Sequence, residues 1–334
     1  MQFEYQHSIE TDERRGVVTV TMNPAFDLTC FIPALRLGEV DRLRAQRVDC
    51  GGKGVNVACF LAGFDVPVVA TGFVGDANSE PFHQLFKDSH VEDRCISVPG
   101  ATRTNVKLIE EEMVRVTDLN AVGFMVRTED ETRLIECIGQ AAQNCHWVVV
   151  GGSLPLGCRP EIVPRLVEAA RAAGAKVMLD TSGRPLAAGL EARPDAVKPN
   201  RKELRDVLDH PIEDVVDAAV ALQRRGVGTV ILSMDAEGAV FTDGREIIRA
   251  VGTARTVQST VGAGDALVAG YILGSLRGLP LAERARLSTG FALGALETVG
   301  PRLPPRETVE LLAASVVVSH VTGVARVGLV TSQG

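Results

Sequence analysis

Aromatic side chains and excess positive charge are both scarce in this sequence. Only 4% of the 334 residues are Phe, Trp or Tyr, with a single Trp, which leaves few stacking platforms for single-stranded nucleic acid. The formal net charge is -7, so neither a nucleic acid nor an anionic membrane surface is an expected partner. An anionic substrate must then be bound by a local cluster of basic groups.

Metal-binding and disulfide patterns are also missing. The seven cysteines form no Cys-x-x-Cys pair, which excludes a zinc framework and is typical of a reducing cytoplasm. No His-Glu-x-x-His or Gly-x-Ser-x-Gly motif is present, so metallohydrolase and serine hydrolase chemistry are excluded. No apolar run approaches the roughly 18 residues that a membrane span needs. We therefore expect a soluble, cytoplasmic protein.

The most informative stretch is 261–266, Val-Gly-Ala-Gly-Asp-Ala, which precedes an apolar run to residue 276. Gly262 and Gly264 allow a tight turn that directs the first amides of a helix toward one point and forms an anion site. Asp265 lies at that point, where it can act as a general base beside a phosphoryl group. By itself the pattern is equally typical of an aspartate that caps a buried helix.

A second glycine-rich turn occupies 51–56, Gly-Gly-Lys-Gly-Val-Asn. Its amides can hold a phosphate, with Lys53 as a point charge, or it can be a plain helix start. It is no P-loop, because Gly54 follows Lys53 where Ser or Thr is required. It is no dinucleotide fingerprint either, because it lies about thirty residues after the first strand.

The order of apolar and polar runs predicts an α/β protein. Strands and helices alternate over nearly 200 residues after position 128, which indicates a mainly parallel sheet covered on both faces. Residues 27–49 and 102–124 alternate between polar and apolar, and we expect them to form one small separate sheet. In such folds ligands bind beyond the carboxyl ends of the parallel strands.

Further candidate residues follow the expected strands or lie on the small sheet, and each also has a structural explanation. Asp27 can accept hydrogen bonds from sugar hydroxyls or cap a turn. Arg103 can bind a phosphate or be a solvated strand charge. Asn200 and Glu203 can organise magnesium and nucleotide phosphates or form a helix capping box, and spacing favours the cap. Residues 233–238 can line a nucleotide pocket or form a hairpin turn.

Three motifs in order, at 20–27, 51–58 and 260–266, resemble the signatures of the ribokinase-like (PfkB) carbohydrate kinase family. The resemblance covers roughly residues 16–315. It implies a three-layer α/β/α fold with a mainly parallel central sheet and a small β-sheet lid, built from the excursions at 27–49 and 102–124. Residues 1–15 and 316–334 have no counterpart in the family and are expected to be terminal extensions.

The resemblance implies a role for each candidate residue. The reacting centre would consist of the base Asp265 and an anion hole formed by the amides of Gly262, Ala263 and Gly264. The sugar would be bound by Asp27, Gly52 and Asn56, and its phosphorylated end by Lys53, Arg103 and Ser153. The nucleotide would contact Asn200, Ser233 and Gly238, while Glu203 would act on Mg²⁺ through water.

Further motifs at 102–108, 116–120, 151–155 and 197–204 are similar to those of family members that phosphorylate ketohexose phosphates. This similarity implies transfer from ATP, with Mg²⁺, to the 6-hydroxyl of fructose 1-phosphate. Fructose 6-phosphate and tagatose 6-phosphate are alternative acceptors, and a silent sugar-phosphate sensor is a further alternative. A homodimer formed through the lid is also implied. Two departures stand out: Asp235 replaces a glycine, and Ala266 replaces a serine.

Overall fold

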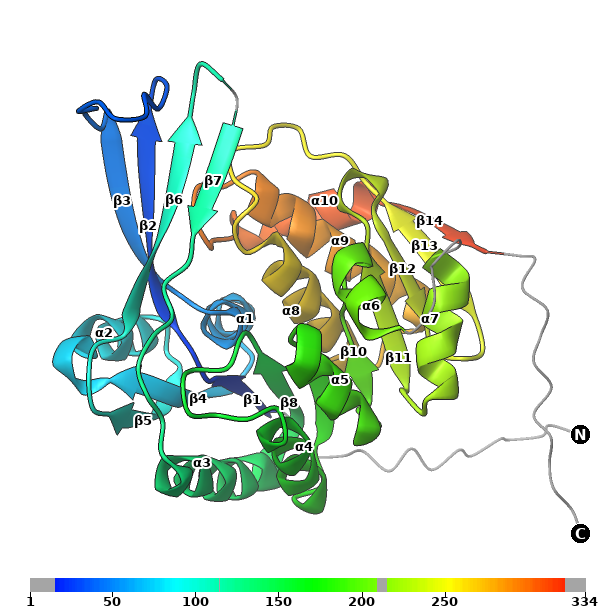
Figure 1. Cartoon of the computed structure of the whole chain (residues 1–334). Helices are drawn as coiled ribbons and strands as arrows, with labels where there is room; N and C mark the ends of the chain where they lie inside the picture. The colour runs from blue at the N-terminus through cyan, green and yellow to red at the C-terminus, as the bar shows by residue number, and fades with distance from the viewer. Residues whose placement is uncertain (1–15, 114, 209–214, 322–334) are drawn as a thin grey trace, which may run out of the picture.

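The chain forms two separate β-sheets (Figure 1). The computed structural model describes residues 16–113, 115–208 and 215–321. The predicted extension 1–15 and most of the second one, 322–334, lie outside the described residues. Within the described part of the chain, the larger sheet has ten strands and the smaller sheet has four.

The larger sheet is parallel over most of its width, as the sequence predicts. Its first strand is flanked on both sides by parallel neighbours, and Val17, Val18 and Val20 are fully buried, which explains its continuous apolar sequence. The parallel strands, in spatial order, are β11 (Thr229–Ser233), β10 (Ala196–Val197), β9 (Lys176–Asp180), β8 (Cys145–Gly151), β1 (Gly16–Thr21), β4 (Val68–Gly75) and β5 (Glu92–Val98).

Three antiparallel strands extend this sheet beyond β11. They are β12 (Ala239–Thr242), β13 (Ile247–Val251) and β14 (Val317–His320). The β14 strand lies past the boundary at 315 that the sequence predicts, so this part of the second extension belongs to the main sheet. The turn between β11 and β12 contains the short 3-10 helix η3 (Asp235–Glu237), so 233–238 does join the two strands of a hairpin.

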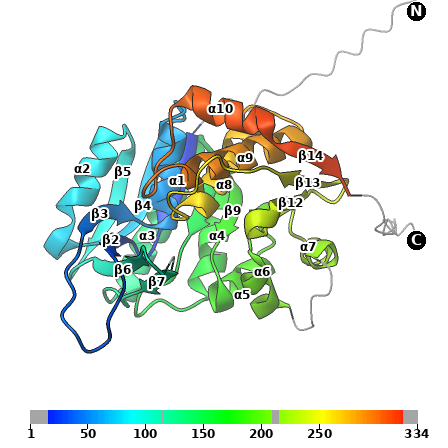
Figure 2. The same ribbon diagram turned by 90° about the horizontal axis from the view of Figure 1, so that it is seen from above.

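Helices cover both faces of the large sheet and complete the three layers (Figure 2). No helix in the described part of the chain is long and apolar enough to cross a membrane. One face is covered by α1 (Lys53–Ala62), α2 (Glu80–Asp88), α8 (Ala263–Leu276), α9 (Leu281–Leu296) and α10 (Arg306–Ser315). The other is covered by α3 (Thr128–Ala141), α4 (Ile162–Ala172), α5 (Gly183–Glu191), α6 (Arg201–Val207) and α7 (Val215–Arg224).

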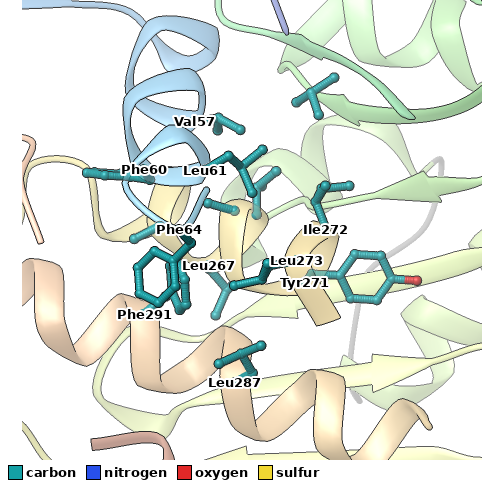
Figure 3. Packing of buried hydrophobic residues seen from close by; sticks show 14 of the residues in the cluster. Val57, Phe60, Leu61, Phe64, Leu267, Tyr271, Ile272, Leu273, Leu287 and Phe291 are labelled. Carbon is teal, nitrogen blue, oxygen red and sulfur yellow. The ribbon is translucent and has the colours of Figure 1, made fainter. Parts of the chain in front are cut away.

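Helix α8 is the most enclosed of these elements, since all its residues from 265 to 275 are buried. Figure 3 shows Leu267 and Leu273 of this helix packed between α1 and α9, whereas Tyr271 extends away from them and donates from its hydroxyl to Thr229 Oγ1 of β11 at 3.0 Å. On the same core, Phe64 stacks on Phe291 with ring centroids 4.5 Å apart. Each fully buried Leu or Phe contributes about 1.5–3 kcal/mol, so α8 is a rigid support for whatever its first turn holds.

The small sheet consists of the two predicted excursions and projects from one side of the larger domain (Figure 1). Its strand order is β3 (Ala45–Gly51), β2 (Ala25–Ile32), β6 (Arg103–Glu110) and β7 (Arg115–Leu119). The inner pair, β2 and β6, is parallel, and both outer pairs are antiparallel. We call these four strands the lid.

Candidate active site

A cleft of about 460 Å³ lies where the lid meets the carboxyl ends of the main strands. It brings together nine of the residues predicted from the sequence. These are Asp27, Gly52, Lys53, Asn56, Arg103, Ser153, Glu203, Gly262 and Asp265. Segments far apart in the chain therefore meet at one point, as a binding site requires.

The carboxylate of Asp265 lies in the first turn of α8 and is only 7% exposed. Its Oδ2 accepts a hydrogen bond of 2.7 Å from Asn56 Nδ2, which α1 presents from the facing helix. Burial, followed by the negative charge of Asp180, raises the pKa of Asp265 to about 6. A base with this pKa is mostly ionised at neutral pH and still binds a proton readily, as general base catalysis requires.

The glycine turn before Asp265 has the geometry of an anion site. Gly262 is the N-cap of α8 with φ 80° and ψ -3°, a left-handed conformation that favours glycine. Helical hydrogen bonds begin with Ala266 N donating to Gly262 O at 2.8 Å, so the amides of 262–265 precede the ladder. These are the three predicted amides together with that of Asp265 itself.

Two residues without a predicted role, Asp180 and Lys198, lie close enough to Asp265 for their charges to shift its pKa. Asp180 ends β9 and is 1% exposed, and its Oδ1 accepts from Lys53 Nζ at 2.8 Å and from Lys198 Nζ at 3.2 Å. Burial alone would raise the pKa of Asp180, but the charges of Lys198 and Lys53 outweigh it and hold that pKa below its usual value. The other oxygen, Oδ2, is buried without a hydrogen-bond partner.

The ammonium groups of this cluster lie close to the glycine turn. The Cβ that a larger residue would carry at Gly264 would lie 3.5 Å from Lys198 Nζ. Lys53 Nζ lies 3.8 Å from Glu203 Oε1, and the surrounding carboxylates raise the pKa of Lys53 although burial opposes them. The Lys53 ammonium is therefore held in its charged form, and both lysines lie beside the place where the amides converge, which favours a bound anion.

The lid side of the cleft carries Asp27 and Arg103, two of the residues predicted to bind the sugar phosphate. Asp27 on β2 accepts a hydrogen bond of 3.1 Å from Asn105 Nδ2, and burial raises the pKa of Asp27. Arg103 at the start of β6 donates from Nη2 to Ser153 Oγ at 3.3 Å and to the backbone oxygen of Asn23 at 3.0 Å. The structure thus joins Arg103 and Ser153, two residues predicted for the phosphorylated end of the substrate.

The predicted nucleotide residues form a second group outside the cleft lining. Asn200 and Ser233 pair as a parallel bridge, and Met234 N donates to Gly238 O at 2.9 Å. Asn200 caps α6 in a complete capping box, in which Glu203 N donates to Asn200 Oδ1 at 2.8 Å and Asn200 N to Glu203 Oε2 at 2.9 Å. The capping interpretation of this pair is therefore confirmed.

The family model for pfkB family carbohydrate kinases matches residues 20–308 of this sequence. The chain belongs to the pfkB family of carbohydrate kinases. Membership of this family makes it a phosphotransferase with the ribokinase-like fold.

Individual relatives agree with this assignment and align along nearly the whole chain. A 1-phosphofructokinase from Rhodobacter capsulatus is 45% identical over 90% of this chain and 97% of its own length. A 1-phosphofructokinase from Xanthomonas campestris is 39% identical over 91% and 98% of the two chains. The solved structure of Escherichia coli phosphofructokinase-2 with substrates and products is 26% identical, covers 90% of this chain and 98% of its own, and superposes with a TM-score of 0.83.

Proposed function

We propose that this pfkB kinase transfers the γ-phosphoryl group of ATP to the 6-hydroxyl of fructose 1-phosphate, giving fructose 1,6-bisphosphate and ADP. The observation that carries this proposal is the buried Asp265, hydrogen-bonded to Asn56 beside the first amides of α8 and in one cleft with Asp27 and Arg103. The relatives named 1-phosphofructokinase support fructose 1-phosphate as the acceptor. A kinase of phosphorylated sugars would work in the cytoplasm.

In this mechanism Asp265 accepts the proton of the attacking hydroxyl while the hydroxyl oxygen approaches the γ-phosphorus in line. Asn56 holds the carboxylate through Oδ2, which leaves Oδ1 for the substrate. The amides of Gly262, Ala263 and Gly264 stabilise negative charge on the transferred group, and the nearby Lys198 ammonium adds to their effect. Closure of the lid over the bound sugar would exclude water, which would otherwise compete as acceptor.

The phosphorylated end of the sugar would lie at Arg103 and Ser153, with Lys53 contributing charge from the start of α1. Arg103 already donates to the backbone oxygens of Ala121 and Asn23, which fixes its guanidinium at the lid margin. Asp27 and Gly52 would contact the sugar hydroxyls. Gly52 has φ 138°, so the backbone approaches the cleft without a side chain in between.

Nucleotide and Mg²⁺ would meet at the side of the cleft that carries Glu203. Asn200, Ser233 and Gly238 would contact the nucleotide. No group of three potential metal ligands exists among the described residues, which fits an ion held mainly by phosphates and waters. Glu203 Oε2 is committed to the cap of α6, so Glu203 would hold the ion through water. The partnerless Asp180 Oδ2 is a second acceptor for such a water. When bound, Mg²⁺ neutralises charge on the transferred group.

Tagatose 6-phosphate and fructose 6-phosphate remain the alternative acceptors, because the cleft residues do not specify which carbon carries the phosphate. A coupled ADP-release assay on the three phosphosugars tests the proposal. We expect the highest kcat/KM for fructose 1-phosphate, by at least about tenfold. A higher value for either other sugar would replace the proposed acceptor.

Asp265→Asn separates an active kinase from a silent sensor on the same scaffold. The variant should lose about 10²- to 10⁴-fold in kcat, because the general base is removed, while sugar-phosphate affinity stays nearly unchanged. Absence of ADP release by the unchanged protein with any of the three sugars would favour the sensor.

We further propose that the protein is a homodimer formed through the lid. The strand registers place Val48, Leu28, Val106 and Leu119 in one row across all four lid strands. This row lies on the face opposite Asp27, and at its ends Val48 is 58% and Leu119 59% exposed. An apolar row of this kind on a projecting sheet fits the same row of a second copy.

A further inference from the structure

A loop between α9 and α10 connects the lid to the phosphate-binding turn. On the lid side, Asp49 of β3 lies directly opposite Asp27 of β2, so both side chains point to the same face of the sheet. Asp27 lines the cleft, whereas Asp49 meets the loop 298–302 that follows α9.

The contacts between Asp49 and the loop are polar and close. Asp49 Oδ1 accepts from Arg302 Nη2 at 3.2 Å, and any Cβ at Gly300 would lie 2.8 Å from Asp49 Oδ2. Arg47, on the same strand, bonds Asp49 and donates from Nη1 to Val299 O at 3.0 Å. The Asp49 side chain is only 10% exposed, so solvent screens these charges weakly.

The same loop forms the back of the phosphate-binding turn. A Cβ at Gly262 would lie 3.2 Å from Pro301 Cα, which places Pro301 directly against the N-cap of α8. The loop is internally braced, because Thr298 Oγ1 donates to Arg302 O at 2.7 Å and Arg302 N to Gly300 O at 2.8 Å. Lid strand, loop and turn are therefore in continuous contact.

We propose that Asp49 is a positioning residue. It couples closure of the lid on the bound sugar to the geometry of the phosphate-binding turn at 262–265. Asp49 does not line the cleft. It holds Arg302 and Gly300, and through Pro301 it keeps the turn at 262–265 in the position that receives the phosphoryl group. This coupling rests on the proposed kinase function, and it makes the affinity for nucleotide depend on the sugar.

The test measures binding, so it does not depend on turnover. The dissociation constant of the Mg²⁺ complex of adenylyl imidodiphosphate is determined with and without a saturating phosphosugar. The phosphosugar is whichever of fructose 1-phosphate, fructose 6-phosphate and tagatose 6-phosphate the unchanged protein binds most tightly. We expect the sugar to tighten nucleotide binding in the unchanged protein. The coupling is the ratio of the nucleotide dissociation constant without the phosphosugar to that with it. In Asp49→Asn this ratio should fall about three- to tenfold, while the affinity for the sugar is retained.

Two further variants distinguish coupling from a general weakening of the lid. Arg302→Met should reduce the ratio as Asp49→Asn does, and the double variant should be no worse than either, because both act through one contact. Asp118→Asn is the matched control. Asp118 lies on β7 of the same lid and forms an ion pair with Lys107 of β6, away from the loop 298–302. This variant should keep the original ratio.

The proposal is overturned if the unchanged protein shows a ratio of one, if Asp49→Asn keeps the original ratio, or if Asp118→Asn loses it equally. Additive effects of Asp49→Asn and Arg302→Met would overturn it as well. If all variants give the expected coupling ratios but the unchanged protein releases no ADP, only the proposed kinase function is contradicted. Failure of the coupling and failure of the kinase function are therefore distinguishable.

Discussion

Besides burial, the negative charge of a neighbouring buried carboxylate, Asp180, raises the pKa of Asp265. Two acids and two lysines share this centre, and the lysines pair with Asp180 through its Oδ1. Asp265 is left with the neutral amide of Asn56 as its hydrogen-bond donor, so its charge is compensated less completely. The environments thus push the two pKa values apart, that of Asp265 upward and that of Asp180 downward.

The pH dependence of the reaction should report this arrangement. Since the pKa of Asp265 is raised to about 6, kcat/KM should rise with pH through that value and level off above it. Asp180→Asn removes a negative charge and leaves Lys53 and Lys198 without their partner. Both changes favour the ionised form of Asp265, so the pH at the midpoint of the acid limb should fall below that of the unchanged protein. The plateau value of kcat/KM at higher pH should also be lower in the variant.

The comparison between variant and unchanged protein removes the contribution of substrate ionisation, which is the same in both. Glu110→Gln is a suitable control, because Glu110 is equally buried but pairs with Arg115 at the far end of β6. An acid limb in Asp180→Asn that stays in place or moves to higher pH would contradict the electrostatic account.

At the scale of single elements, two features of the first turn of α8 require glycine at position 262. The residue adopts φ 80°, and it lies against Pro301. Gly262→Ala should therefore cost about 1–2 kcal/mol in the free energy of unfolding for the left-handed conformation, and displace the turn as well. We expect a loss of about tenfold or more in kcat, measured together with urea unfolding.

Gly278 provides the matched comparison for this element. It has φ 66°, but a Cβ there would meet no atom within 4 Å. Gly278→Ala should lose a similar amount of stability and keep its kcat. Equal kcat values for the two alanine variants would show that the contact between Gly262 and Pro301 is unimportant for catalysis.

The turn between β11 and β12 holds Asp235 in a left-handed conformation with φ 50°, where the family usually has glycine. If the nucleotide lies here, the carboxylate repels its phosphates and the backbone is mildly strained. Asp235→Gly should lower the KM for ATP about two- to threefold and raise stability by a few tenths of a kcal/mol.

Asp235→Asn separates the two causes, because asparagine tolerates the left-handed region and carries no charge. The same fall in KM in both variants would assign the effect to charge. Unchanged KM values in both would place the nucleotide phosphates away from this turn.

The elements differ in how far the sequence predicts them. The parallel strands are predicted because burial on both faces requires continuous apolar runs, and the lid because its strands alternate. The antiparallel edge was not predicted beyond the possible hairpin turn at 233–238, because short edge strands such as β14 carry a weak pattern. The pairing of Asp180 with Lys53 and Lys198 was missed, since it joins three elements that meet only after the sheet has formed.

The whole molecule consists of a main domain and a projecting lid. This division determines which surface is available to a second copy of the chain. The proposed base, Asp265, is anchored on α8 inside the main core, whereas both faces of the lid carry exposed apolar side chains. On the face opposite Asp27, the row formed by Val48, Leu28, Val106 and Leu119 is exposed at both ends, while Leu28 and Val106 are partly buried. A two-fold axis near this row would bring each residue close to its counterpart.

Val48→Asp tests the proposed dimer at this scale. It places a charge on the proposed shared surface of both copies, so the cost of desolvating these charges opposes association. We expect the dimer dissociation constant, measured by sedimentation velocity over a concentration series, to rise at least about tenfold. Leu311→Asp is the control, because Leu311 is 72% exposed on α10 and lies outside the lid. If the control dissociates the dimer and Val48→Asp does not, the interface lies on the helical face of the main domain instead.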